Sequence, residues 1–192
     1  MKEDYAPRDC IPLQAGTLVA HPNELPEMVH MHDPATMTFI DFTIVKPETI
    51  LADMHIDVAH AQLRATDSCL LLVTDKTGAL EGILTWDECH GEAPIRLAEK
   101  QHIGHSDIRV GMVMTPLQDI KVMEWSHIKD ARVGHIVSTL HKLECEHLLV
   151  VEHHKVRGMF AARQIAKQTG HAVTGVEVPV HSLAEIVRTL RH

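Results

Sequence analysis

An internal duplication limits the folds open to this chain more than any other feature of the sequence. The second copy opens at Val113-Met114-Thr115-Pro116, and Met37-Thr38 matches Met114-Thr115 in the first copy. Each copy then has a helical pattern, a continuous apolar run and a closing Gly with two apolar residues. The runs are Leu70–Val73 and Leu148–Val151, and the closings are Gly82–Thr85 and Gly158–Ala161. The two copies keep the same order at nearly constant spacing, which indicates two related structural units.

The predicted order of elements in each copy is β-α-β-β-α, an α/β (α+β) arrangement. Apolar residues at near-helical spacing predict the helices, and continuous apolar runs predict strands buried on both faces. In the first copy we expect a strand Phe42–Val45, a helix from Ile50 to about Arg64 capped by Thr49, strands Cys69–Val73 and Leu80–Leu84 joined by a turn at Asp75–Gly78, and a helix from Trp86. In the second we expect a strand Ile120–Met123, a helix Asp130–Leu143, strands Leu148–Val151 and Val156–Phe160, and a helix Ala162–Lys167 ended by Gly170.

The chain divides into five segments around these copies. An N-terminal arm (1–35), rich in proline, is expected to wrap the surface, with a short edge strand at Gly16–Val19. The first repeat (36–90) and the second (109–170) are joined by a linker (91–108) with a short helix Pro94–Gln101. In the C-terminal tail (171–192), Ser182 and Glu185 form a capping-box pattern before a predicted amphipathic helix.

Charge and composition exclude several classes of protein. The 192 residues carry a net charge of −8, which argues against a nucleic-acid partner. No apolar run reaches the roughly 18 residues of a membrane span. The charged start Met1-Lys2-Glu3-Asp4 does not resemble a signal peptide. We therefore expect a cytoplasmic protein without a membrane partner, with its four cysteines as free thiols.

The duplicated pattern resembles a tandem pair of CBS domains, the Bateman module, over about residues 36–170, and it is similar to uncharacterised bacterial stand-alone proteins of this kind. The resemblance implies two CBS repeats related by a pseudo-twofold axis, with facing sheets and clefts between them. It also implies a homodimer without catalytic activity that binds AMP, ADP, ATP or S-adenosylmethionine and regulates a partner protein. No cofactor is expected to be required.

The same resemblance implies the residues of the ligand site. Family members end the closing strand in Gly-x-x-[Ser/Thr]-x-x-[Asp/Asn], in which the hydroxyl contacts phosphate and the acid binds the ribose diol. Thr85 matches in the first repeat, whereas Glu88 stands at the acidic position and Asp87 is an adjacent substitute. The second repeat departs further, with Ala161 and Gln164 at these positions. The candidate ligand-binding residues are Gly82, Thr85, Asp87, Glu88, Met114, Thr115, Pro116, Gly158, Arg163 and Gln164.

Two alternatives to nucleotide binding stay open at this point. Thr85-x-x-Glu88 is also a helix capping box, which is compatible with ligand binding but does not require it. The departures at Ala161 and Gln164 favour a structural interaction scaffold with degenerate clefts.

Neither catalysis nor a metal centre is predicted. The chain has no G-x-S-x-G, Walker or H-E-x-x-H motif, and Gly104-His105-Ser106-Asp107 is interpreted as a polar linker. With 17 histidines, close spacings arise by chance; the best metal candidate is His141, Cys145 and His147. The weaker pairs are His30 and His32, His102 and His105, Cys89 and His90, and His153 and His154. No metal ligand is assigned, although a histidine-based metal or pH sensor is a further alternative.

Overall fold

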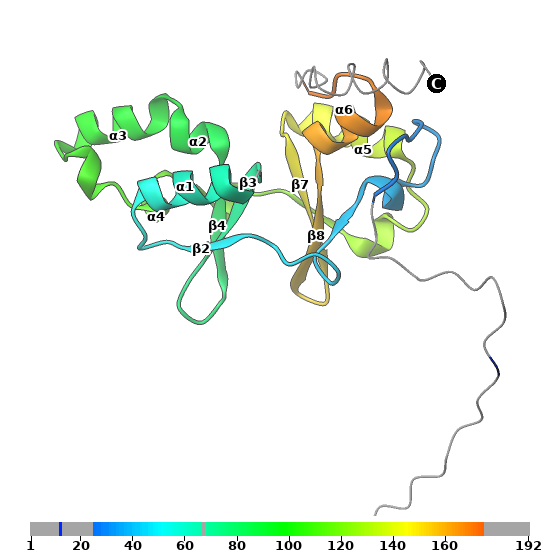
Figure 1. Cartoon of the computed structure of the whole chain (residues 1–192), viewed down its shortest axis with the longest axis horizontal. Coiled ribbons are helices and arrows are strands. Elements are labelled where there is room, and N and C mark those ends of the chain that lie inside the picture. Colours follow the sequence, from blue (N-terminus) through cyan, green and yellow to red (C-terminus); the bar gives the residue numbers. More distant parts are fainter. Residues whose placement is uncertain (1–11, 13–24, 67, 175–192) are drawn as a thin grey trace, which may run out of the picture.

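A computed structural model describes residues 12, 25–66 and 68–174. The predicted edge strand Gly16–Val19 and the predicted C-terminal helix after Ser182 lie outside these residues. The described chain forms two halves side by side, each with a four-stranded sheet covered by helices on its outer side (Figure 1). This confirms the predicted mixed α/β class.

The first sheet has the strand order β2-β3-β4-β5, and the second has the order β1-β8-β7-β6. In each sheet one parallel pair, β2–β3 or β6–β7, stands beside an antiparallel hairpin, β3–β4 or β7–β8. The strands are β1 Ile40–Asp41, β2 Thr49–Leu51, β3 Leu70–Thr74, β4 Leu80–Thr85, β5 Thr115–Pro116, β6 Val122–Glu124, β7 His147–Glu152 and β8 Lys155–Ala161. The α-helices are α1 Ile56–Thr66, α2 Trp86–His90, α3 Glu92–Gln101, α4 Val110–Val113, α5 Val133–Leu143 and α6 Ala162–Thr169, and the 3-10 helices are η1 Ala35–Thr38, η2 His105–Asp107, η3 Leu117–Asp119 and η4 Trp125–His127.

Two short strands cross between the halves. β1 precedes the first repeat's sheet in sequence but pairs antiparallel with β8 of the second sheet, and β5 precedes the second repeat's sheet but pairs with β4 of the first. Ile40 faces Met159 as Thr115 faces Ile83, so Ile40 and Thr115 are structural equivalents. The match of Met37-Thr38 to Met114-Thr115 was therefore wrong by two positions.

The shared geometry of the two crossings explains the closing glycine of each repeat. A Cβ added to Gly82 would lie 2.5 Å from the carbonyl oxygen of Thr115. A Cβ on Gly158 would overlap the carbonyl oxygen of Ile40 and the ring of Phe39. Both glycines are thus needed because another backbone passes directly over them, and not because of a positive φ.

Three apolar clusters hold the molecule together. One lies under the helices of each half, and a third lies between the two sheets, where Leu72 and Ile83 of the first meet Leu149 and Met159 of the second. Successive residues of β3 alternate between clusters: Leu71 packs with the helices of its own half, and Leu72 packs in the central cluster. The prediction that β3 is buried on both faces is confirmed.

The first strand and first helix of the first repeat were predicted wrongly. Phe42–Val45 lies in turns, while Thr49–Leu51 forms β2 and the helix α1 begins only at Ile56. Leu51, which falls within the predicted helix, lies in β2 instead. A strand of three residues has little local signal, and β2 exists because it pairs in parallel with β3 in the sheet.

The other elements agree with expectation apart from their ends. α2 begins at Trp86 and α6 is ended by Gly170 in the left-handed conformation, as predicted. The linker helix α3 begins two residues early, α5 begins three residues late, at Val133, and β6 is displaced to Val122–Glu124. The described part of the arm does more than cover the surface, because Val29 is buried in the core of the second half.

Replacement of Gly158 by Ala should destabilise the fold by about 1–3 kcal/mol, because the new methyl group overlaps the backbone of β1. Gly104→Ala is a matched control, since the nearest atoms to its added Cβ are side-chain atoms at 3.4 Å, and its effect should stay within about 0.5 kcal/mol. Urea denaturation followed by circular dichroism measures both. Equal stability of the two variants would contradict the assigned role of Gly158.

Candidate functional site

The main candidate site is a cleft of about 850 Å³ between the two repeats, here called cleft 1. The first repeat lines it with the end of α1, the start of β3 and the junction of β4 with α2. The second repeat lines it with the segment before β6, the turn between α5 and β7, and α6. The lining residues are Leu63, Arg64, Ser68, Cys69, Ile83, Thr85, Trp86, Asp87, Thr115, Asp119, Ile120, Lys121, Leu143, Cys145, Glu146, His147 and Arg163.

Thr85 and Glu88 form the predicted capping box at the start of α2. The Thr85 amide and hydroxyl both donate to Glu88 Oε2, at 2.6 and 3.0 Å, and the Glu88 amide donates to Thr85 Oγ1 at 3.4 Å. The hydroxyl of Thr115, on the crossing strand β5, donates to the other oxygen of the Glu88 carboxylate. Both carboxylate oxygens therefore have partners within the protein, and Glu88 does not line cleft 1.

Asp87 is the acid of this segment that lines cleft 1. Because α2 begins at Trp86, Asp87 lies one residue nearer the start of the helix than the capping acid Glu88. Trp86 also lines the cleft; its indole stacks on the His90 ring at 3.9 Å between centroids, and the residue remains 39% exposed.

Charges of both signs surround cleft 1. Arg64 of α1, Lys121 just before β6 and Arg163 of α6 supply positive charge. Asp87, Asp119 and Glu146 supply negative charge. Burial raises the pKa of Glu146, and the neighbouring Asp87 carboxylate raises it further. The site therefore offers partners to a ligand that carries both anionic groups and hydrogen-bond donors.

His147 is a half-buried titratable group of the cleft. Its Nε2 lies 3.1 Å from Sγ of Cys69, so the contact joins the starts of the two central hairpins. Burial lowers the pKa of His147 to about 4, against the opposing effect of Asp87. The imidazole is therefore neutral at pH 7.

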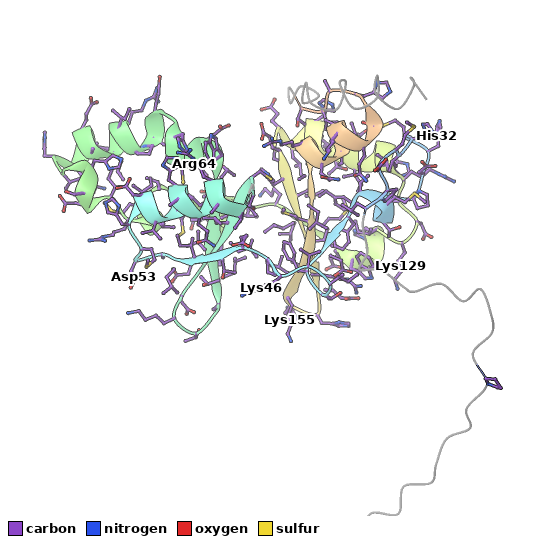
Figure 2. All side chains as sticks on the ribbon, viewed as in Figure 1. His32, Lys46, Asp53, Arg64, Lys129 and Lys155 are labelled. Atoms are coloured by element: carbon purple, nitrogen blue, oxygen red, sulfur yellow. The ribbon has the colours of Figure 1, made fainter. Side chains whose placement is uncertain are left out.

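A second cleft of about 550 Å³, cleft 2, shares Ser68, Cys69 and Arg163 with cleft 1. Its basic residues are Lys46, Arg163 and Lys167, with Glu48 as an acid. Lys46 lies on the segment that runs between the two halves (Figure 2). At the positions that match Thr85 and Glu88, the cleft presents the methyl of Ala161 and the amide of Gln164. Cleft 2 thus has a different chemistry from cleft 1.

The structure brings together only part of the predicted site. Thr85, Asp87, Thr115 and Arg163 line cleft 1, and Gln164 and Arg163 line cleft 2. The remaining predicted residues do not line either cleft: Gly82, Glu88, Met114, Pro116 and Gly158. Of these, Gly82 and Gly158 permit the strand crossing, and Met114 packs against the core of the first half.

Several charged or aromatic residues that line cleft 1 were not assigned to the ligand site from the sequence, among them Arg64, Trp86, Lys121 and His147. Arg64 and Lys121 lie near elements whose ends were predicted inaccurately. The apolar run after His147 could have indicated its position, because the first residue of a central strand lies at the edge of the space between the repeats.

The described cysteines are neither disulfide-bonded to one another nor part of a compact metal-ligand group. Within the described chain, Cys69, Cys89 and Cys145 form no disulfide with one another. Burial, followed by the charge of Glu88, raises the pKa of Cys89 to about 11, so this thiol is unreactive at neutral pH. His141, Cys145 and His147 do not form a compact ligand group among the described residues.

No helix in the part of the chain that the structure describes is both long and apolar enough to cross a membrane.

Comparison with solved structures identifies the fold. An uncharacterised conserved protein from Pyrococcus horikoshii superposes with a TM-score of 0.52 at 16% identity, covering 85% of this chain and 96% of its own. A CBS-domain protein from Agrobacterium tumefaciens gives 0.52 at 16% identity over 68% and 93%. A putative signal-transduction protein with CBS domains from Burkholderia ambifaria gives 0.50 at 18% identity over 64% and 81%. No sequence-family model matches the chain, and no curated protein matches it significantly.

The fold and the clefts define a two-repeat α/β module whose candidate ligand sites lie between the repeats. Its fold is that of a tandem pair of CBS domains, as the duplicated sequence pattern predicted.

Neutral His147 should make the stability of the fold depend on pH. Its pKa of about 4 lies below the ordinary value of 6.5, so its contribution is complete above pH 6.5 and is lost as pH falls toward 4. The loss amounts to at most about 3 kcal/mol. The free energy of unfolding of the wild type relative to His147→Gln, measured by urea denaturation at intervals from pH 7.5 to 4, should decrease over this window. A difference independent of pH would contradict the prediction.

Proposed function

We propose that this chain is a non-catalytic regulatory module that binds an adenine-containing ligand in cleft 1. AMP, ADP, ATP and S-adenosylmethionine are the candidates that the resemblance to CBS pairs implies. The observation that carries the proposal is the position of Thr85 and Asp87 on one wall of a cleft whose other walls supply Arg64, Lys121 and Arg163.

Asp87 is the residue proposed to bind the ribose. A carboxylate can accept a hydrogen bond from each of two neighbouring hydroxyl groups, and Asp87 lines the cleft, whereas both oxygens of Glu88 already accept bonds from Thr85 and Thr115. We therefore assign the ribose to Asp87 and a supporting role to Glu88.

The other ligand groups have partners of suitable chemistry. Arg64, Lys121 and Arg163 suit a phosphate or carboxylate, whereas the hydroxyl of Thr85 already donates its proton to Glu88. Trp86 offers an apolar ring surface to a purine. Because residues of both repeats line the cleft, a bound ligand would contact both halves at once.

In this proposal a bound ligand regulates the partner protein by changing how the two halves of the module are arranged. A ligand that contacts both halves can shift the module between two arrangements only if it binds one of them more tightly. In this proposal the chain acts as a homodimer, and the favoured arrangement changes its affinity for a regulated partner protein.

An interaction scaffold without a ligand is the second candidate function. It is favoured by Ala161 and Gln164 in cleft 2, where the hydroxyl and carboxylate of the family pattern are both missing. It is also favoured by the internal hydrogen bonds of Glu88, which satisfy that carboxylate without a ligand.

Isothermal titration of the full chain with AMP, ADP, ATP and S-adenosylmethionine distinguishes these functions. At least one ligand should bind the wild type, and Asp87→Asn should weaken its binding by about 10- to 150-fold, the equivalent of one hydrogen bond to a charged group. Asp130→Asn is the matched control, because Asp130 is exposed and lines none of the clefts described above. It should bind as the wild type does.

The results of these titrations distinguish an error in the assigned cleft from an error in the proposed function. Binding that Asp87→Asn leaves intact but Gln164→Ala removes would place the ligand in cleft 2. Binding lost in neither variant would contradict both clefts. The absence of heat with all four ligands would contradict the adenine-binding function and favour the scaffold.

A further inference from the structure

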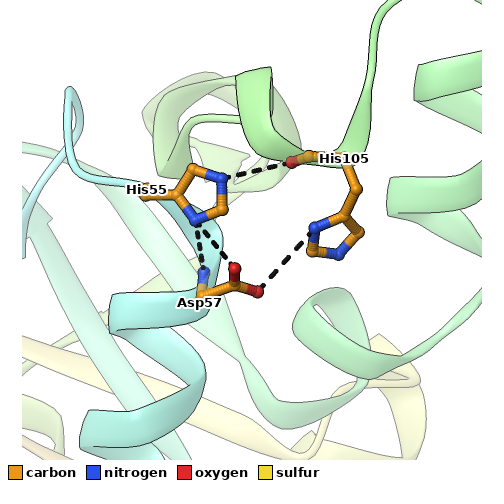
Figure 3. Close-up of side chains that lie close together, drawn as sticks. All are labelled: His55, Asp57 and His105. Carbon is orange, nitrogen blue, oxygen red and sulfur yellow. Dashed lines mark hydrogen bonds and ion pairs between the residues drawn. The ribbon is translucent and has the colours of Figure 1, made fainter.

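Two neighbouring side chains, His55 and Asp57, meet the distant His105 at the outer end of the first half (Figure 3). His55 directly precedes α1, Asp57 lies in the first turn of α1, and His105 begins η2 in the segment that connects the repeats. One potential ligand atom from each residue lies within 4.8 Å of the other two. In particular, Nδ1 of His55 lies 3.2 Å from one Asp57 oxygen, and Nδ1 of His105 lies 3.8 Å from the other.

The hydrogen bonds of His55 orient its ring toward this group. Its Nε2 lies 3.2 Å from the carbonyl oxygen of His105, and its Nδ1 lies 3.1 Å from the amide nitrogen of Asp57. In a neutral ring these contacts place the proton on Nε2, which donates to the carbonyl, and leave the lone pair on Nδ1. A backbone carbonyl that accepts from the distal nitrogen is one of the common partners of a metal-binding histidine.

The lone pair of Nδ1 and the Asp57 carboxylate are both electron-rich and face each other at 3.2 Å. A cation between them would convert this proximity into favourable interactions with both groups. Binding there replaces the hydrogen bond that Nδ1 accepts from the Asp57 amide. His105 supplies a third donor atom on the exposed side of the group.

We propose that His55, Asp57 and His105 form a binding site for a divalent transition-metal ion. Two imidazole nitrogens and one carboxylate oxygen suit Zn²⁺, Co²⁺, Ni²⁺ or Cu²⁺ better than Ca²⁺ or Mg²⁺, which prefer oxygen ligands. The side chains of Asp57 and His105 are 65% and 62% exposed, so a fourth position is open to water.

The backbone around the site holds its ligands in place. The Ile56 amide donates to the carbonyl of Ile108 at 3.2 Å, and His55 forms an isolated antiparallel bridge with Arg109. These contacts fix the start of α1 against the segment that carries His105 before any ion arrives. A metal ion would therefore join α1 to the connection between the repeats with little rearrangement.

Zn²⁺ titration of the full, chelator-treated chain, in competition with a chromophoric chelator, tests the site. One tight equivalent is expected in the wild type, and its affinity should fall by at least about 100-fold in His105→Ala and in His55→Asn. The His55→Asn variant keeps a side-chain acceptor for the Asp57 amide but loses the contact with the His105 carbonyl, so its metal-free melting temperature should fall by only a few degrees. His141→Ala removes an exposed histidine of α5 and is the matched control, with unchanged affinity.

Co²⁺ substitution gives an independent readout. Ligands of nitrogen and oxygen alone should produce weak visible bands without the intense charge-transfer absorption of a thiolate ligand. A charge-transfer band that Cys145→Ser removes would overturn the proposal in favour of His141, Cys145 and His147. The proposal is equally overturned if no tight equivalent is found, or if His105→Ala and His55→Asn bind Zn²⁺ as the wild type does.

Discussion

Two short strands that pass over bare glycine backbone hold the repeats together. β1 and β5 each complete the sheet of the other repeat, over Gly158 and Gly82 respectively. This exchange brings the two sheets face to face around the central apolar cluster, and it also builds cleft 1. Thr115 reaches Glu88 only because β5 lies beside β4. The exchange of β1 and β5 therefore underlies both the fold and the candidate site, since neither repeat alone contains all the residues of the cleft.

The duplication and the central strands could be predicted because their signals are local. A run such as Leu70–Val73 is buried on both faces wherever it lies in the sheet, and a Thr85-x-x-Glu88 pattern caps a helix with its own atoms. The three residues of β2 could not be predicted, because their strand conformation comes from pairing with β3. The two-position error in matching the repeats has a similar origin: Met37-Thr38 resembles Met114-Thr115 in sequence, yet backbone pairing makes Ile40 the equivalent of Thr115.

The candidate site was predictable in its position but not in the roles of its residues. The closing motif indicated Thr85 and its neighbours, but sequence alone could not decide which acid faces the cleft. In the structure Asp87 lines cleft 1, whereas the Glu88 carboxylate accepts from three donors, the Thr85 amide, the Thr85 hydroxyl and the Thr115 hydroxyl, and has little capacity left for a ligand. The histidine cluster gave no usable signal, since His105 lies far from His55 in the sequence and the two meet only where His55 forms its bridge with Arg109.

Helix α1 connects the two regions of chemical interest in the first half. Asp57 lies in its first turn, and Leu63 and Arg64 line cleft 1 near its end. Its 11 residues span roughly 16 Å, and its buried face, with Ile56, Ala59 and Leu63, packs it as a rigid element. A metal ion bound at the start of α1 and a ligand bound near its end would therefore both contact the same rigid helix. Each could change the affinity of the other only to the extent that both favour the same position of α1, and any such coupling would be reciprocal.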